Sequence, residues 1–360
     1  MKKNNPTMLN LNKRFFGPVK QTILQSRAWS IEGFAYQSGV EAVTIEVGRG
    51  VFTWTPFMGS ELWDWSVDGV SRKFEGFRKE PVYQAPFLAN YGAFLIHCGV
   101  RGMGHPSMED THPHHGELPV SQPVRAWIEI DEEDKEFPLA LCAEFHSHIP
   151  FVGEYSFVPA LRIHKSGTFV VVESGLTNLA HAPFEYQYLG HVNFNYPKSG
   201  RLEYSIANFT DREVVVLDET FEGVTKKPEL FLTLDKGCTL DPELVAVIDY
   251  GKKSPSTFRN GKFALSRMSD EKGGSTWVVA RTDILDHTVI WLTQTPDRKA
   301  AGFALPATSG PTGFTNEKKM GNGKVLPGKQ SITLWYAFGV GDGDIEKDIA
   351  TALSRSGMTE

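Results

Sequence analysis

The feature that most constrains the fold is a repeated texture of short apolar runs broken by turn residues. Runs rich in Val, Ile, Phe, Tyr and Thr recur along the 360 residues, and the 34 glycines and 21 prolines are spread between them. β-Branched and aromatic residues favour strands, whereas glycine and proline favour the turns that join strands. The number and spacing of these runs predict an all-β fold in the form of a large sandwich.

Individual elements can be placed from this texture. Residues 40–54 alternate apolar and polar side chains around a glycine-containing break, which predicts a hairpin. The same criteria predict further strands at residues 167–179, 212–221, 243–250, 275–283, 287–295 and 330–340. Helical periodicity is convincing only near the C-terminus, where Ile345, Ile349 and Leu353 follow Asp344 as the expected cap. We therefore expect one short C-terminal helix packed on the sandwich.

The chain is expected to form one domain. Similar strands and turns run through it without a linker or a change of composition, and a chain of this length can bury a full core. The prediction is a loosely held N-terminal arm at residues 1–20, followed by a single domain at residues 21–360.

Charge argues against partners of two kinds. The formal net charge is -6, and the 37 basic residues are scattered among 43 acidic ones rather than grouped. A dispersed, slightly acidic surface has no general attraction for a phosphate backbone or for anionic lipid. We therefore expect no nucleic acid and no membrane among the partners.

Cysteine usage and the N-terminus predict a compartment. Cys98, Cys142 and Cys238 stand far apart without a CxxC pair, which predicts buried thiols rather than a disulfide framework or a thiolate zinc site. Residues 1–18 lack the apolar run of a secretory signal, and the chain has no apolar stretch of membrane-spanning length. A cytoplasmic location is the expectation.

Histidines are concentrated in one short segment. Residues 109–119 read EDTHPHHGELP, which places His112, His114 and His115 close to Glu117. A His-x-His pair followed by glutamate is similar to the metal-binding run of cupins, in which imidazole and carboxylate groups suit zinc, iron or manganese. The spacing to Glu117 is shorter than in cupins, and no late histidine block completes the pattern. We therefore predict no metal, and keep a cupin-like metal-dependent sugar isomerase as an alternative.

Three polar segments resemble one known family. They are residues 97–120, with Cys98-Gly99-Val100, His115-Gly116 and Leu118-Pro119; residues 186–197, with Gly190-His191-Val192-Asn193-Phe194; and residues 300–313. In order and spacing these blocks resemble the aldose 1-epimerase, or galactose mutarotase-like, superfamily, within its aldose-epimerase-like branch that carries a domain of unknown function. The resemblance covers roughly residues 40–340. It implies a β-supersandwich that binds a monosaccharide or sugar acid in a cleft, without a cofactor.

The resemblance also implies a reaction, the interconversion of the anomers of an aldose. A base removes the proton of the C1 hydroxyl while an acid protonates the ring oxygen, and each positioned group contributes about 10²–10⁴-fold. His191 matches the family's acid, and His115 matches the histidine that holds the sugar. The family's base is a glutamate just before a proline in the late block, where this chain has Leu305. The base is therefore unidentified at this point.

Five further residues are candidates for sugar binding. Asn193 lies in the same sequence block as His191, and Arg101 and Glu117 lie on either side of His115. Arg101 and Arg162 could pair with an anionic sugar substituent. Asn178 could form a hydrogen bond with a sugar hydroxyl. Because Leu305 replaces the expected carboxylate, a non-catalytic carbohydrate-binding or sensor protein is a second alternative. No motif predicts which sugar is bound or the oligomeric state.

Overall fold

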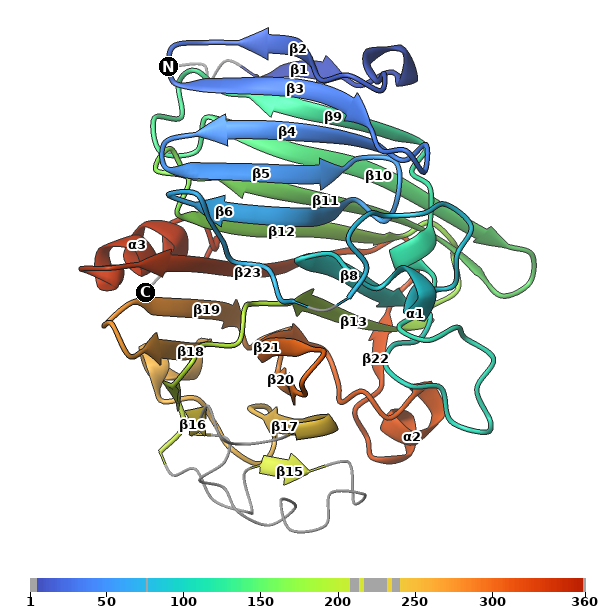
Figure 1. Ribbon diagram of the computed structural model, residues 1–360. Helices are drawn as coiled ribbons and strands as arrows, with labels where there is room; N and C mark the ends of the chain where they lie inside the picture. The colour runs from blue at the N-terminus through green and yellow to red at the C-terminus, as the bar shows by residue number, and fades with distance from the viewer. Residues whose placement is uncertain (1–4, 76, 208–213, 217–231, 235–239, 359–360) are drawn as a thin grey trace.

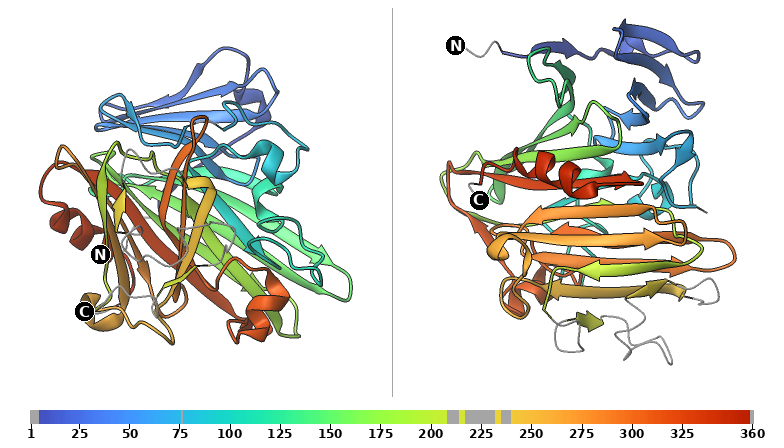
Figure 2. Two further views of the ribbon diagram at one scale, coloured as in Figure 1. Left: turned by 60° about the horizontal axis from the view of Figure 1, so that its bottom comes forward. Right: turned by 90° about the vertical axis from the view of Figure 1, so that its left-hand side faces the viewer.

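The computed structural model describes residues 5–75, 77–207, 214–216, 232–234 and 240–358. Within these ranges the chain is mostly strand, which confirms the predicted all-β class. Its strands form two large antiparallel sheets, and Figure 1 shows strands β3 to β6 in front of β9 to β12. Figure 2 shows the same layers from two other sides.

The first sheet has ten strands among the described residues. In spatial order they are β1 (Thr7–Asn10), β9 (Arg125–Ile130), β10 (Leu139–Ile149), β11 (Gly153–Ile163), β12 (Phe169–Asn178), β23 (Ser331–Gly341), β19 (Ser275–Arg281), β18 (Phe263–Asp270), β14 (Gly200–Tyr204) and β16 (Thr233–Leu234). The segment expected to be an N-terminal arm therefore contains β1, which pairs with β9.

The second sheet has thirteen strands among the described residues. Along its main path they are β15 (Val214–Val216), β17 (Leu240–Asp249), β20 (His287–Gln294), β21 (Lys299–Ala307), β13 (Phe184–Val192), β8 (Leu95–Val100), β6 (Glu61–Val67), β5 (Gly50–Thr55), β4 (Glu41–Val47), β3 (Trp29–Ala35) and β2 (Gln21–Gln25). Two short strands pair beside this path: β22 (Lys324–Leu326) with β13, and β7 (Val70–Ser71) with β6.

The predicted strands correspond closely to these elements. Residues 40–54 form the β4–β5 hairpin, and the segments predicted at 167–179, 243–250, 275–283, 287–295 and 330–340 coincide with β12, β17, β19, β20 and β23. The prediction for 212–221 is met over β15 and otherwise lies outside the described residues, as does Cys238. Cys98 and Cys142 are buried, and within the described residues neither forms a disulfide.

The main core fills the space between the sheets. Trp65 of β6 packs edge-on against Phe338 of β23 in the opposite sheet, with ring centroids 5.7 Å apart, and against Phe94 at 5.4 Å. All three side chains are buried. Each large apolar side chain removed from water in this way contributes roughly 1.5–3 kcal/mol to folding. The tryptophans of the early strands are thus core residues, which fixes the two sheets face to face.

Helices are few and short in the described part of the chain. The α-helices are α1 (Phe87–Asn90), α2 (Phe314–Lys319) and α3 (Ile345–Leu353), and the 3-10 turns are Lys13–Phe15, Leu118–Val120 and Phe258–Gly261. The predicted C-terminal helix is confirmed as α3, whose first turn is capped by the Asp344 carboxylate accepting from the Glu346 backbone N–H at 3.2 Å. Its apolar stripe packs with Trp277 and Trp335 on the outer face of the first sheet. None of the described helices combines the length and apolar character that a membrane crossing requires.

Candidate functional site

Five neighbouring strands of the second sheet, β17, β20, β21, β13 and β8, present a common outward face. Directly paired residues on antiparallel strands share a face. Leu189 pairs with Cys98 on one side and with Ala307 on the other, so His191, two residues along β13, lies on that face as well. The alternate residue Tyr188 points the other way, toward Tyr336 of the opposite sheet. His191 is therefore turned away from the main core.

His115 reaches the same region from the loop that follows β8. Its backbone N–H donates to the Gly104 carbonyl and its carbonyl accepts from the Gly99 N–H, both at 2.9 Å. His115 has a left-handed backbone with φ of 60°, and Gly116 follows with φ of 81°. A Cβ on Gly116 would lie 2.4 Å from the Gly102 carbonyl oxygen. Only glycine fits this close approach, which explains why the His-Gly pair is needed to aim the ring.

The structure brings the two predicted histidines together. The rings of His115 and His191 are perpendicular, at 86°, with centroids 5.2 Å apart. Each ring has a buried Nδ1 atom without a hydrogen-bond partner in the described part of the chain, and the Nε2 atom of His191 lies 3.5 Å from the Tyr91 hydroxyl. Buried polar atoms are rarely left unpaired, so each such atom calls for an explanation, such as a bound ligand, an ordered water or a catalytic role.

Aromatic side chains surround the two imidazoles. Tyr91 and Trp291 lie 5.7 Å and 5.4 Å from the His191 ring, and Phe87 lies 4.9 Å from the His115 ring, centroid to centroid. His191 is 4% exposed. This burial lowers the pKa of His191 to about 3, and burial followed by the charge of His191 holds the pKa of His115 well below its ordinary value. Both rings are neutral at neutral pH.

One carboxylate lies at the edge of this aromatic group. Glu243 of β17 accepts a hydrogen bond through Oε2 from the indole Nε1 of Trp291, at 2.6 Å. Burial raises the pKa of Tyr91, and the charges of Cys98 and Glu243 raise it further. Glu243 is therefore within electrostatic range of the hydroxyl that contacts His191. The sequence analysis did not select Glu243, because this residue is simply the first residue of the strand predicted at 243–250. The only signal in the sequence was an acidic residue at the start of an apolar run.

The position expected to carry the family's base is apolar and sealed. Leu305 pairs with Val289 on β20, and alternation along β21 puts it on the same face as Ala307 and His191. It is 0% exposed. A leucine neither accepts nor donates a proton, so any base must come from another strand.

The two predicted asparagines hold structure rather than a ligand. Asn193 accepts from the Tyr91 hydroxyl at 3.0 Å and donates to the Ala93 carbonyl at 2.9 Å, which fixes Tyr91 beside His191. Asn178 donates to the carbonyls of Ala182 and Leu326, at 2.8 and 3.0 Å, and accepts from a backbone N–H. Both are 0% exposed, so neither amide is available to a sugar hydroxyl.

Arg162 lies away from the imidazoles. On β11 of the first sheet, its guanidinium donates to Glu173 at 2.6 Å and to Glu129 at 3.2 Å. Alternation along β11 places it on the face that carries Ala160 and the outer cluster with Trp127. Its expected role in sugar binding has no support from this placement, because Glu173 of the neighbouring strand β12 and Glu129 of β9 already pair it.

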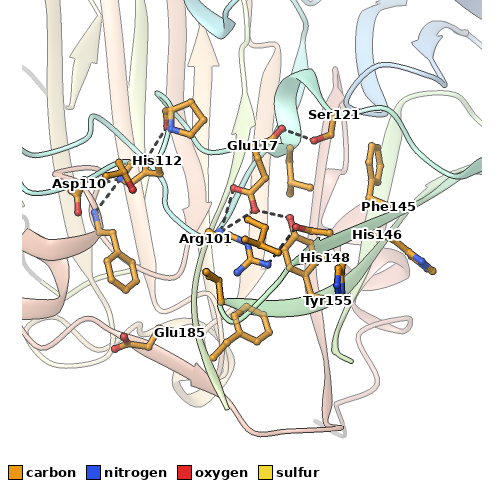
Figure 3. Close-up of a pocket in the computed structure, with 18 of the residues that line it drawn as sticks. Arg101, Asp110, His112, Glu117, Ser121, Phe145, His146, His148, Tyr155 and Glu185 are labelled. Carbon is orange, nitrogen blue, oxygen red and sulfur yellow. Dashed lines mark hydrogen bonds and ion pairs between the residues drawn. The ribbon is translucent and has the colours of Figure 1, made fainter. Parts of the chain in front are cut away.

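Arg101 and Glu117 line a separate cleft with a volume of about 1090 Å³. Glu117 accepts from the Tyr155 hydroxyl at 2.6 Å and from the Arg101 backbone N–H at 3.3 Å. Figure 3 shows these three side chains turned toward one another. Neither His115 nor His191 lines this cleft, although Glu117 is only two residues from His115. Four of the predicted site residues are therefore divided between two places, His115 and His191 at the imidazole pair and Arg101 and Glu117 at this cleft.

The remaining clustered histidines do not converge on a metal site. His114 turns its Nδ1 toward the Nδ1 of His105 at 3.3 Å, whereas the Nδ1 of His112 contacts the Pro113 carbonyl at 2.9 Å. Over the described ranges, no three His, Cys, Asp or Glu side chains lie close enough together to hold an ion. The cupin-like alternative has no geometric support.

Comparison with known proteins identifies the fold. No protein-family model and no curated protein sequence matches the chain. A solved structure of a candidate aldose 1-epimerase from Klebsiella pneumoniae superimposes with a TM-score of 0.77 at 17% identity, over 99% of this chain and 93% of that one. The chain has the galactose mutarotase-like fold.

Two further structures agree with this fold. A galactose mutarotase-like protein from Clostridium acetobutylicum gives a TM-score of 0.57 at 16% identity, over 88% of this chain and 99% of that one. A candidate aldose 1-epimerase from Escherichia coli gives 0.57 at 12% identity, over 83% and 98%. The predicted galactose mutarotase-like β-supersandwich is confirmed.

Proposed function

We propose that this galactose mutarotase-like chain binds a monosaccharide or sugar acid at the paired imidazoles and interconverts its anomers. The observation that carries the proposal is the pairing of His115 and His191, two residues remote in sequence, with rings 5.2 Å apart and an unpartnered, buried Nδ1 in each. Such atoms cost stability unless a ligand satisfies them. A location in the cytoplasm remains part of this proposal.

The reaction assigns a role to each histidine. A base takes the proton of the C1 hydroxyl and an acid gives a proton to the ring oxygen; the C1–oxygen bond of the ring breaks as the C1 carbonyl forms. Rotation about C1–C2 and reversal of both transfers then close the ring on the other face. His191 is the proposed acid, and His115 the proposed contact to the C1 side of the sugar.

Glu243 is the proposed base. Leu305 cannot take a proton, whereas the Glu243 carboxylate is held beside Trp291, whose ring is 5.4 Å from His191. Acid and base would then stand on strands β13 and β17, with the aromatic side chains between them forming the surface on which a pyranose ring stacks.

Burial of His191 sets a condition on this mechanism. Because its pKa is lowered to about 3, the ring must first gain a proton before it can act as an acid. The protonated fraction falls about tenfold for each pH unit above that pKa. Anomer exchange that depends on His191 should therefore become faster as the pH is lowered through the range in which the protein stays folded.

A second candidate function is sugar binding without turnover. The buried Leu305 beside His191 favours it, because the expected carboxylate is replaced by an apolar side chain. The fold and the imidazole pair would then serve recognition alone.

One set of measurements tests both functions. A panel of aldoses and sugar acids is assayed for anomer exchange by NMR and for thermal stabilisation, which reports binding whether or not turnover occurs. We expect His191→Gln to lower the exchange rate by about 10²–10⁴-fold. The matched control is His181→Gln, at an exposed histidine outside the site.

The outcomes separate the candidates. Exchange that His191→Gln removes and His181→Gln retains supports the isomerase. Stabilisation without exchange supports the binding protein if His191→Gln removes the stabilisation. Full exchange in His191→Gln, or neither exchange nor stabilisation with any sugar of the panel, contradicts the proposal.

A further inference from the structure

The second place of interest is the cleft that contains Arg101 and Glu117. Its volume of about 1090 Å³ is at the upper end of the range for small-molecule sites, roughly 300–1,000 Å³. It lies between the loop that follows β8, the β10–β11 hairpin and the start of β13. The proposed isomerisation uses none of the side chains that line it.

Arg101 is a cation without an ionic partner at this cleft. Its Nη2 atom donates to the Gly153 carbonyl at 2.8 Å, and its guanidinium lies 5.4 Å from the centre of the Tyr155 ring. Among the described residues, no carboxylate lies within ion-pair distance of it, and its buried Nε atom has no hydrogen-bond partner. A half-buried, unpaired guanidinium is positioned to bind an anion.

The acids that line the cleft are already engaged by other groups. Glu109 pairs with Lys319 at 2.6 Å, and Glu185 pairs with Lys318 at 2.7 Å. Asp110 accepts from the Thr315 hydroxyl at 2.6 Å and from the Ser107 backbone N–H at 2.8 Å. The two lysines offset the charges of Glu109 and Glu185, whereas Asp110 is held by neutral donors; none of these three acids pairs with Arg101 in the described part of the chain.

Glu117 completes the polar side of the cleft without pairing the guanidinium. Its carboxylate accepts from the Tyr155 hydroxyl at 2.6 Å and from the backbone N–H of Arg101, not from its side chain. It can accept a further hydrogen bond from a ligand hydroxyl.

The wall beside Arg101 is aromatic. The rings of Tyr155 and Phe184 are stacked, with centroids 5.9 Å apart and an angle of 18° between their planes. Phe145 also lines the cleft. Tyr155, Phe145 and Phe184 are only 1%, 3% and 9% exposed, so these rings form the apolar floor of the cleft and strengthen an ion pair made above them rather than offering open faces to a ligand.

We propose that this cleft binds a sugar-sized ligand carrying a carboxylate or phosphate group, with Arg101 pairing the anion and Glu117 accepting a hydrogen bond from a ligand hydroxyl. The site is distinct from the paired imidazoles and does not depend on the isomerase proposal. It would allow the chain to recognise a charged sugar independently of any anomer exchange.

Calorimetric titration tests this site. D-Glucuronate, D-glucose 6-phosphate and uncharged D-glucose are titrated into the wild type and Arg101→Met. We expect at least one charged sugar to bind more tightly than D-glucose, and Arg101→Met to weaken that sugar about tenfold or more. Arg101→Lys keeps the charge but loses the planar fork, so an intermediate loss is expected. A preference for glucuronate assigns a carboxylate, and a preference for the phosphate assigns a phosphate.

The matched control is Arg125→Gln. Arg125 is also an arginine beside an aromatic ring, 4.6 Å from the centre of Trp127, but it pairs with Glu144 at 2.5 Å and lies outside the cleft lining. Charged-sugar affinity should be unchanged in this variant. Thermal melting establishes that each variant is folded, and Arg101→Lys provides the comparison if Arg101→Met does not fold.

Three results would overturn the inference. The first is that neither charged sugar binds more tightly than D-glucose. The second is that the Arg101 variants bind the charged sugars as the wild type does, or that Arg125→Gln weakens them equally. The third is that His191→Gln loses charged-sugar binding while Arg101→Met retains it, which would move the anion to the imidazoles. Loss of exchange in His191→Gln with charged-sugar binding intact leaves this site supported, so the two proposals fail independently.

Discussion

The imidazole pair and the neighbouring cleft differ in burial and in charge. His115 and His191 are enclosed by aromatic rings, are neutral, and have nitrogen atoms without partners. The cleft is open and charged, and Arg101 is the one basic group of its lining with a permanent charge and, within the described residues, no ionic partner. Solvent and salt screen charges weakly at the enclosed imidazole pair and strongly at the open cleft. The pair is therefore suited to proton transfer, and the cleft to recognition of a charged group.

One loop supplies both regions. Between Gly99 and Glu117 the chain turns back on the end of β8, so that His115 faces the aromatic group and Glu117, two residues later, faces the cleft. His115 and Gly116 both have positive φ, at 60° and 81°. The local turn at these two residues is therefore shared by both regions.

The largest expected effect is that of Gly116→Ala. Its Cβ would meet the Gly102 and Gly99 carbonyl oxygens at 2.4 and 2.6 Å, at a φ that alanine disfavours. We expect a loss of roughly 3–5 kcal/mol of stability, from backbone strain and overpacking together. Both sites should fail together. Gly39→Ala is the control, because φ there is also positive, at 85°, but nothing lies within 4 Å. Urea denaturation with both binding assays checks this, and equal losses in the two variants would refute the steric argument.

The next effect separates the two regions. Glu243→Gln keeps an oxygen that can accept from Trp291 Nε1 but cannot take a proton. Anomer exchange should fall by about 10²–10⁴-fold, while charged-sugar binding at the cleft stays unchanged. NMR exchange and calorimetry measure the two quantities on the same sample. Glu46→Gln, at an exposed glutamate of β4, is the control. Unchanged exchange in Glu243→Gln would remove Glu243 as the base.

The sequence predicted the fold better than it predicted the site. Alternation and turn residues are local signals, and they located the β4–β5 hairpin, β20, β23 and helix α3. The two histidines followed from motif resemblance. Tyr91, Trp291 and Glu243 could not be found in this way, because their convergence depends on the order of the strands in the sheet. In that order β20 and β21 lie between β17, which carries Glu243, and β13, which carries His191.

Residue type alone did not predict which groups Arg162 and Asn178 contact. Arg162 was expected to meet an anionic sugar, but the register of β11 with β12 and β9 with β10 brings Glu173 and Glu129 to it first. Asn178 was expected to reach a hydroxyl, but its amide fastens the loop near Leu326. Some of these partners are near in sequence, such as Glu173 and Ala182, but Glu129 and Leu326 are remote, and strand register and loop packing decide which group each side chain meets.

A smaller effect concerns stability against pH. The folded-state pKa of His191, about 3, lies below its ordinary value of 6.5, so the unfolded chain binds more protons between these values and stability falls as pH drops through this range. Each pH unit costs about 1.4 kcal/mol for this one group. His191→Gln should therefore flatten the acid limb of stability between about pH 4 and 6 by that slope. Urea melts at several pH values measure this dependence of the unfolding free energy on pH. His181→Gln should leave it unchanged. If His191→Gln and the wild type lose stability equally with falling pH, His191 is not buried as a neutral ring.

The smallest effect tests screening in the two regions. Exposed charges interact over a Debye length of about 10 Å at 0.1 M salt and about 3 Å at 1 M, whereas buried groups are screened much less. Charged-sugar binding through the half-exposed Arg101 should therefore weaken a few-fold between 0.05 and 0.5 M sodium chloride, by about 1 kcal/mol or less. Exchange of an uncharged aldose at His191 should not change over the same range, because that ring is enclosed by Tyr91 and Trp291. If both quantities respond equally to salt, the sugar and the anion share one electrostatic environment, and the division of the molecule into an enclosed pair and an open cleft is wrong.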